Sequence, residues 1–326
     1  KADSGVDVDG AIYTLGTYAK MAASLPDGHF LPDGEAQSLA KDGSFATRHV
    51  QVPVGGLALF INAFNFPAWG LWEKAAPALL SGVPVVIKPA TATAWLTQRM
   101  VKDVVDAGVL PAGALSVVCG SSAGLLDALE PLDVLSFTGS ADTAALLRAH
   151  PAVTRHSVRV NIEADSVNSA LLMPDATPGT EAFDLFVKEL AREMTQKSGQ
   201  KCTAIRRAFV PASAYAAAAE AVGQRLARTV VGNPRNESVR MGALVSQEQK
   251  ASVLAGLAQL KTEATVLFDG NTQPWVDADA ASACVAPVLL GTEAPTRAQV
   301  LHAVEVFGPV STLMPYDSVE EAFAMI

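Results

Sequence analysis

The sequence predicts an α/β protein with a doubly wound, parallel sheet, followed by a second α/β block. The chain has 326 residues, which is enough for two domains, and half of them are apolar. Short apolar runs alternate with segments of helical periodicity, and this alternation is typical of βαβ units. The same style continues after Val158, so we place the start of the second block there.

The first block contains strands and helices in strict alternation. Pro67 stands near the start of one helix, and Gly108 ends another in which Leu96, Met100 and Val104 recur at helical spacing. We expect strands at 51–62, 83–88, 115–119 and 134–137 and helices at 67–80, 93–107, 124–129 and 141–149. Before them, residues 25–50 are rich in Pro, Gly and polar residues and are expected to form loops with an extended arm.

The second block has longer helices between its strands. Its Ala-rich segment 212–221 is a good helix former rather than a linker. We expect strands at 158–162, 168–173, 205–210, 265–269 and 284–290 and helices at 180–195, 212–230 and 246–260. The chain does not begin with Met, and it ends inside a further helical segment near 317–323, so we expect a fragment cut at both ends.

Composition and charge exclude several classes of function. The net charge is -9 and no basic stripe is present, which argues against a nucleic-acid surface. No run of 18 apolar residues exists, so a membrane-spanning helix is not expected. Three widely spaced cysteines fit reduced thiols in a cytoplasmic protein, and the five histidines, His29 among them, lack metal-ligand spacing. We therefore expect no catalytic metal.

Cys202 is the most informative residue of the chain. A thiol nucleophile with a carboxylate base elsewhere can carry out covalent chemistry on a carbonyl, and Glu163 is a candidate for that base. A lone Cys is often only a small buried apolar residue, and Glu163 could equally be an ordinary strand-end carboxylate. The neighbours of Cys202 in 199–201 are not typical core residues, and Lys201 is expected to help stabilise a thiolate.

Three further segments follow predicted strands. Asn65 could donate to an oxyanion, although an N-cap of the following helix is the favoured interpretation of this segment alone. Lys88 ends an apolar strand, where a lysine suits a cofactor phosphate or ribose but could also simply be solvated. The turn 138–140 could present backbone N–H groups to an anion or be an ordinary tight turn. The pattern Gly-x-Gly-x-x-Gly is absent, so a dinucleotide would have to be held in another way.

A competing motif occurs at residues 120–124, where Gly-x-Ser-x-Gly is expected between a strand and a helix. This is the setting of a hydrolase nucleophile elbow, with Ser122 as nucleophile and His150, His156 or His302 as base. The pattern is short and no suitable acid-then-histidine segment follows. A simple Gly/Ser turn is therefore the favoured interpretation.

In this order, these segments resemble the aldehyde dehydrogenase superfamily. The resemblance covers essentially the whole chain, and the complete ordered set is highly specific although no single segment is. The segments are Phe64-Asn65-Phe66-Pro67, Ile87-Lys88-Pro89, Phe137-Thr138-Gly139-Ser140, Glu163, Gly199-Gln200-Lys201-Cys202 and Glu305-Val306-Phe307-Gly308-Pro309. The resemblance implies a fold of the aldehyde dehydrogenase type. It places a Rossmann-like cofactor-binding domain at 1–162, with part of an oligomerisation arm near 25–50, and an incomplete catalytic domain at 163–326.

The resemblance also implies a role for each matching residue. Cys202 resembles the nucleophile, Glu163 the base that activates water, and Asn65 the donor to the oxyanion, while Lys74 matches a lysine linked to proton relay. The cofactor would be NADP or NAD, and its matching positions are Lys88, Thr91, Gly139, Ser140, Glu305 and Phe307. The family also implies a homodimer or homotetramer.

Two departures from the family pattern bear on the cofactor. Ala164-Asp165-Ser166 replaces the common Leu-Gly-Gly after the glutamate, so the backbone near the cofactor is expected to differ. Thr91 stands where many NAD-preferring members carry a glutamate that binds the ribose. A carboxylate there would repel a 2′-phosphate, so its absence predicts a preference for NADP.

Within the superfamily, segments 161–168 and 199–203 resemble the branch that acts on CoA-linked semialdehydes in the breakdown of aromatic acids such as benzoate. A CoA-acylating relative is an alternative, but such enzymes generally lack the glutamate base, so Glu163 argues against it. A catalytically silent protein on the same fold is the other alternative, and the presence of Cys202, Asn65 and Glu163 disfavours it.

Overall fold

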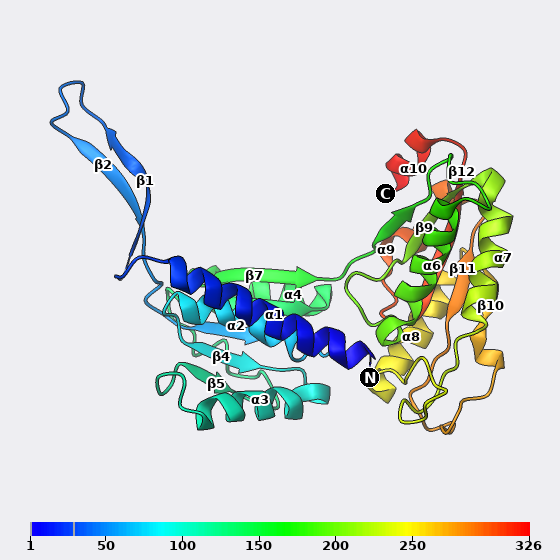
Figure 1. Cartoon of the computed structure of the whole chain (residues 1–326), viewed down its shortest axis with the longest axis horizontal. Helices are drawn as coiled ribbons and strands as arrows, with labels where there is room; N and C mark the ends of the chain where they lie inside the picture. The colour runs from blue at the N-terminus through cyan, green and yellow to red at the C-terminus, as the bar shows by residue number, and fades with distance from the viewer. Residues whose placement is uncertain (1, 29) are drawn as a thin grey trace. The chain divides into compact units, whose positions relative to one another are not determined.

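The computed structural model describes residues 2–28 and 30–326, so Lys1 and His29 lie outside the described residues. The described chain divides into two compact units, Ala2–Ala164 and Asp165–Ile326, called here the N-terminal unit and the C-terminal unit. Each unit has a five-stranded sheet of its own (Figure 1). Because the division follows Ala164, Glu163 belongs to the N-terminal unit.

The main sheet of the N-terminal unit is entirely parallel and has the strand order β5-β4-β3-β6-β7. Its strands are β3 (Ala58–Ile61), β4 (Val85–Lys88), β5 (Leu115–Val117), β6 (Val134–Gly139) and β7 (Arg159–Ala164). Strand β3 is fully buried, as expected for the middle of a doubly wound sheet. The prediction of a parallel α/β fold is thus confirmed, and the carboxyl ends of all five strands lie at one edge.

Helices cover this sheet, and the first of them was not predicted. They are α1 (Ala2–Ser24), α2 (Trp69–Leu80), α3 (Ala94–Asp106), α4 (Ala141–Ala149) and α5 (Pro151–Thr154). Helix α1 packs against α2 and contributes the buried Ala11 to the core under β3 and β4. The buried carboxylate of Asp7 accepts hydrogen bonds from the backbone N–H groups of Ala68 (3.1 Å) and Trp69 (2.8 Å). Asp7 therefore satisfies two donors at the start of α2 that have no acceptor within the helix.

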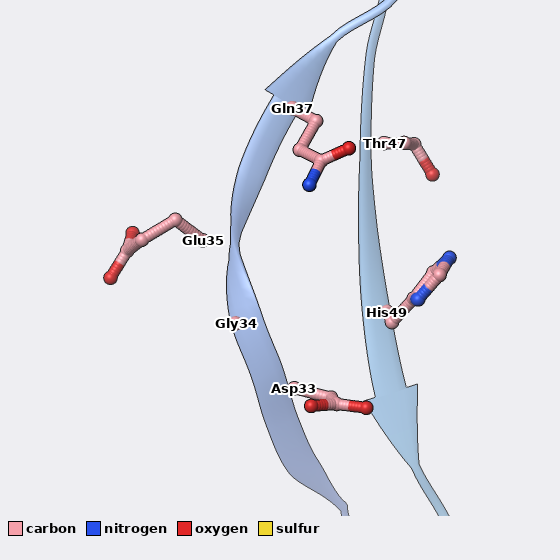
Figure 2. A pocket seen from close by; sticks show the side chains of 6 residues that line it. All are labelled: Asp33, Gly34, Glu35, Gln37, Thr47 and His49. Carbon is pink, nitrogen blue, oxygen red and sulfur yellow. The ribbon is translucent and has the colours of Figure 1, made fainter.

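The arm expected near residues 25–50 is a two-stranded antiparallel hairpin of β1 (Leu31–Ser38) and β2 (Ala46–Gln51). It extends away from the main sheet of its own unit (Figure 1). Polar side chains line it, and Glu35 points away from the neighbouring strand (Figure 2). Nearly every residue of both strands is exposed, so the hairpin has no apolar core of its own.

The sheet of the C-terminal unit has the strand order β10-β11-β12-β9-β8, and only the β10–β11 pair is antiparallel. Its strands are β8 (Ser169–Leu171), β9 (Arg207–Pro211), β10 (Thr265–Asp269), β11 (Val288–Gly291) and β12 (Val310–Tyr316). Its helices are α6 (Glu181–Thr195), α7 (Tyr215–Leu226), α8 (Gln247–Leu260), α9 (Val300–Ala303) and α10 (Val319–Met325). Apolar clusters pack on the two faces of this sheet.

Two predicted elements were wrong, and one strand was not predicted. The expected strand 51–62 is two strands, because Pro53, Gly55 and Gly56 separate the end of β2 from β3. The expected helix 124–129 is a series of turns, because Gly124 has a φ of +78°, outside the helical region. The Leu side chains of this segment still pack into an apolar cluster. Strand β12 was missed although it is the middle strand of its sheet, because it follows Gly308-Pro309 and reads as a short apolar run without alternation.

None of the helices formed by the described residues is long and apolar enough to cross a bilayer.

Candidate active site

The parallel sheet of the N-terminal unit brings several predicted site residues to one edge. Lys88 is the last residue of β4, and Thr138 and Gly139 end β6. Glu163 lies on β7 directly beside Thr138 in the strand register. Ligands of open α/β sheets bind beyond this edge, where backbone and side-chain groups of neighbouring strands converge.

Lys74, Thr138 and Glu163 form a chain of hydrogen bonds at this edge. The Lys74 Nζ donates to Thr138 Oγ1 at 2.5 Å and to Asn62 Oδ1 at 3.4 Å. The Thr138 hydroxyl in turn donates to Glu163 Oε2 at 3.4 Å. The structure therefore links Lys74 of α2 to Glu163 of β7 through a hydroxyl that was not predicted as a site residue.

The ionisation of this cluster is shifted by burial. Burial lowers the pKa of Lys74, although the charges of Glu73 and Glu163 oppose that shift. Burial raises the pKa of Glu73, and the nearby Glu163 carboxylate adds to that rise while Lys74 opposes it. A lysine whose pKa is lowered exchanges its proton more readily near neutral pH, as a proton relay requires.

Asn65 lies in the loop between β3 and α2 and is partly buried. The favoured interpretation of its segment, an N-cap of the helix, was wrong: the cap residue is Ala68, which provides no side-chain hydrogen bond. Asp7 supplies the acceptor that an Asn cap would have provided. The Asn65 amide is therefore not used to start α2.

The residues proposed for the cofactor form a suitable cradle on this edge. Ser140 caps α4, and its Oγ accepts a hydrogen bond from the Thr143 N–H at 3.3 Å. A Cβ on Gly139 would lie 2.5 Å from the ring of Phe137, so the backbone here must stay without a side chain. Thr91 is exposed and begins the 3-10 turn Thr91–Thr93, three residues beyond Lys88. An α-helix N-terminus and a lysine at the end of another strand on the same sheet edge suit an anionic cofactor.

In the C-terminal unit, Cys202 lies on a loop with unusual backbone geometry. Lys197, Ser198 and Gly199 have consecutive φ values of 52°, 57° and 69°, which L-residues rarely adopt. A Cβ on Gly199 would lie 2.2 Å from the carbonyl oxygen of Gly308, so only glycine allows this close approach. Such strain persists only where surrounding contacts hold it, and it is common at functional sites.

Several hydrogen bonds hold the Cys202 loop. Asn168 Nδ2 donates to the carbonyl oxygens of Cys202 (2.5 Å) and Ala204 (3.1 Å). Gln200 Oε1 accepts from the Val245 N–H at 3.0 Å. The Cys202 thiol is partly exposed on this fixed backbone. The ammonium of Lys201, the residue before Cys202, donates to the Glu193 carboxylate at 2.7 Å and 2.9 Å.

Glu305 and Phe307, the other two predicted cofactor positions, lie on the segment before β12. The Glu305 Oε2 accepts a hydrogen bond from the Ser166 N–H at 3.0 Å. Its Oε1 lies 3.5 Å from Nη2 of the buried Arg206. Burial raises the pKa of Glu305, while the Ser166 N–H and the Arg206 charge lower it. The Phe307 ring lies 5.6 Å from the Arg206 guanidinium.

The hydrolase-elbow alternative is contradicted by the fold. Ser122 is exposed, and the turns after it are not the helix that a nucleophile elbow requires. His150 lies 3.4 Å from Asp127 and caps the short α5, while His302 contacts the Arg207 guanidinium at 2.7 Å. Across residues 2–28 and 30–326, no three His, Cys, Asp or Glu side chains are grouped as metal ligands.

Thr138, Asn168 and Arg206 were missed by the sequence analysis. Thr138 was noted only as part of a turn, and its position beside Glu163 depends on the strand register. Two consecutive arginines, Arg206 and Arg207, occur where the buried strand β9 begins, and this is the one signal from which a buried charge could have been inferred. Asn168 gave no signal, because its contact with Cys202 joins residues 34 apart.

The chain belongs to the aldehyde dehydrogenase family, whose model matches residues 1–326. It is 57% identical over 328 residues to the 3,4-dehydroadipyl-CoA semialdehyde dehydrogenase of Aromatoleum evansii, covering 100% of this chain and 64% of that protein. It is 32% identical to the aminoacetaldehyde dehydrogenase of Pseudomonas aeruginosa, covering 98% of this chain and 60% of that protein. The chain thus spans less than two thirds of the length of these relatives.

Solved structures share the fold. The betaine aldehyde dehydrogenase of Staphylococcus aureus, solved with NAD+, matches with a TM-score of 0.85 at 22% identity over 99% of this chain and 62% of that one. The succinic semialdehyde dehydrogenase of Streptococcus pyogenes, solved with NADP+, matches with a TM-score of 0.82 at 22% identity over 98% of this chain and 65% of that one. These likenesses confirm the predicted aldehyde dehydrogenase fold.

Proposed function

We propose that this chain is part of an NADP-dependent dehydrogenase that oxidises a CoA-linked semialdehyde from aromatic-acid breakdown to the carboxylic acid. The observation that carries the proposal is the hydrogen-bonded Lys74–Thr138–Glu163 chain in a protein that also holds Cys202 on a fixed loop. The 57% identity to a dehydrogenase of a CoA-linked semialdehyde supports the substrate class.

The first chemical step belongs to Cys202. Its thiolate attacks the carbonyl carbon, and the negative charge that forms on the carbonyl oxygen is accepted by the Asn65 amide and the Cys202 N–H. A nicotinamide cofactor held by Lys88, Ser140 and Glu305 would supply the acceptor for the hydride that leaves the same carbon. The acyl group then remains on Cys202 as a thioester.

The second step belongs to Glu163. Its carboxylate removes a proton from water as the water oxygen attacks the thioester carbon, and the Cys202 thiolate leaves. Glu163 must then lose that proton before the next turnover. The Thr138 hydroxyl and the Lys74 amine are hydrogen-bonded in series to Glu163 and provide a route for it. A CoA-acylating enzyme needs no such base, so this chain of groups favours hydrolysis.

The cofactor preference rests on Thr91. Lys88, Ser140 and the Gly139 backbone suit the phosphates and ribose, while Glu305 and Phe307 suit the nicotinamide end. Thr91→Glu is expected to lower kcat/KM for NADP by on the order of 100-fold and to affect NAD much less, because a carboxylate repels the 2′-phosphate. Thr93→Glu, on the same turn, is the control. A higher kcat/KM with NAD than with NADP in the wild type would contradict the preference.

The substrate is tested by reduced-nicotinamide formation in the full-length protein. A CoA-linked semialdehyde and the matching free semialdehyde are offered with NADP or NAD. We expect fast turnover of the CoA-linked semialdehyde and slow turnover of the free semialdehyde. Equal turnover of simple aldehydes would leave the dehydrogenase activity standing and overturn the CoA-linked substrate, and no turnover of any aldehyde would overturn the activity itself.

We also propose a cytoplasmic homodimer or homotetramer in which the β1–β2 hairpin takes part in association. The exposed, polar hairpin has no core of its own, which suits a segment that packs on another subunit. Sedimentation of the wild type and of a protein lacking residues 31–51 would decide this, since an unchanged oligomer would contradict it.

A further inference from the structure

Arg206 joins the Cys202 loop to the segment that carries Glu305 and Phe307. Arg206 is only 5% exposed and directly precedes β9. The guanidinium donates from Nη1 to the Gly308 carbonyl oxygen at 2.7 Å and from Nη2 to the Gly199 carbonyl oxygen at 2.9 Å. A further bond reaches the Lys201 carbonyl oxygen at 3.3 Å. One planar fork thus fixes both loops at the point where Gly199 and Gly308 touch.

The same guanidinium contacts both side chains expected at the nicotinamide end. Its Nη2 lies 3.5 Å from Glu305 Oε1, and the two side chains are only 4% and 8% exposed. The Phe307 ring lies against it at 5.6 Å. Breaking a buried ion pair by removing one partner leaves an uncompensated charge, so Glu305 depends on Arg206 for its position and ionisation.

Arg206 is also a buried cation that interacts electrostatically with Cys202. Burial lowers the pKa of Arg206, while the negative charges of Glu305, Glu193 and the Cys202 thiolate raise it. The attraction between thiolate and guanidinium is mutual, so Arg206 stabilises the thiolate. The ammonium of the neighbouring Lys201 donates to Glu193 and Gln196.

We propose that Arg206 is a positioning residue that sets the reactivity of Cys202 and, through Glu305 and Phe307, the binding of the nicotinamide cofactor. The second half of this inference rests on the proposed dehydrogenase function, and the first half does not. The role needs both properties of arginine: its charge acts on the thiolate, and its fork holds the two loops together.

Three variants of the full-length protein, each with Cys119→Ser to remove the exposed second thiol, separate these properties. Arg206→Met removes charge and fork, Arg206→Lys keeps the charge, and Arg192→Met removes an exposed arginine of α6 as the control. Two quantities are measured. One is the rate of Cys202 alkylation by iodoacetamide between pH 5 and 10, and the other is KM for NADP against kcat.

Arg206→Met is expected to shift the alkylation profile to higher pH, with alkylation about tenfold slower at neutral pH. Arg206→Lys is expected to keep the wild-type profile. Both variants should raise KM for NADP about tenfold, more than they lower kcat, because the cofactor side chains lose their support. Arg192→Met should change neither quantity.

An Arg206→Met protein that is folded by circular dichroism and keeps the wild-type alkylation profile would overturn the inference, even if its Tm falls. If Arg206→Met does not fold, Arg206→Lys decides: an unchanged KM for NADP overturns the inference and a raised KM supports it. Alkylation needs no turnover, so a wild type that oxidises no aldehyde would overturn the proposed function while the role of Arg206 at Cys202 is still decided by the pH profile.

Discussion

The two units hold their functional groups in different ways. In the N-terminal unit, Lys88, Thr138 and Glu163 share one edge because parallel strands end together. In the C-terminal unit, the Cys202 loop has three successive residues with positive φ and is held by side chains from distant segments. Strand topology alone is therefore enough to bring Thr138 and Glu163 of the proposed relay together, whereas the strained loop of Cys202 needs specific tertiary contacts to hold it.

The largest expected effect comes from removing the nucleophile. Cys202→Ser should lower kcat/KM by about 10⁴-fold or more with an unchanged fold, because the alcohol is a much weaker nucleophile than the thiolate. Turnover is followed by nicotinamide absorbance. Cys119→Ser is the matched control and should keep wild-type activity, since Cys119 is exposed at the end of the short β5. An active Cys202→Ser enzyme would rule out covalent catalysis at this loop.

Removing the carboxylate of the N-terminal unit should affect only the second chemical step. Glu163→Gln is expected to release a burst of reduced nicotinamide and then turn over about 10²- to 10⁴-fold more slowly, because thioester hydrolysis lacks its base. Rapid quench and mass spectrometry would detect the acyl-enzyme. If no acyl group accumulates on Cys202 in a single turnover, Glu163 does not have this role.

The strained loop should be more sensitive to a single methyl group than an ordinary turn is. Gly199→Ala is expected to lower the free energy of unfolding of the C-terminal unit by about 3 kcal/mol, since the new Cβ meets the Gly308 carbonyl and φ is +69°. Gly179→Ala is the control: its φ is +92° but its Cβ meets nothing within 4 Å, so about 1 kcal/mol is expected. If urea denaturation shows that the two variants lose the same free energy of unfolding, the Cys202 loop is no more sensitive to a methyl group than an ordinary turn.

The smallest expected effect concerns the pH dependence of the relay. Burial lowers the pKa of Lys74 in the folded protein below its ordinary value of 10.5. Between the folded pKa and 10.5, the unfolded chain therefore binds more protons than the folded one. The wild type should therefore become more stable as pH rises through the folded pKa towards 10.5. Lys74→Met should lack this rise in stability in denaturation experiments from pH 7 to 10.5. Lys102→Met removes an exposed lysine of α3 and should retain it. The opposite slope in the wild type would contradict the assignment.

The same contrast explains what could be predicted from sequence. The alternation of strand and helix periodicity is a local property of the sequence, so the parallel fold and the position of Lys88 at a strand end were both predictable. The Cys202 loop was recognisable as a motif, but its geometry was not. Its contacts with Asn168 and Gly308 join segments that are distant in the sequence, 102 residues apart in the case of Arg206 and Gly308. Periodicity is a local property and does not predict such contacts. The Asn65 segment, taken alone, predicted a cap for the same reason: the carboxylate that accepts from the Ala68 N–H is that of Asp7, 61 residues before Ala68.

Asp7 has a consequence for how the N-terminal unit moves. The backbone amide protons of Ala68 and Trp69 are covered by a carboxylate from α1, not by α2 itself. These two protons can therefore exchange with solvent deuterium only when α1 detaches locally from α2. Their exchange rates would report the opening of α1, while amide protons in the middle of α2 would report the unfolding of the helix that carries Lys74.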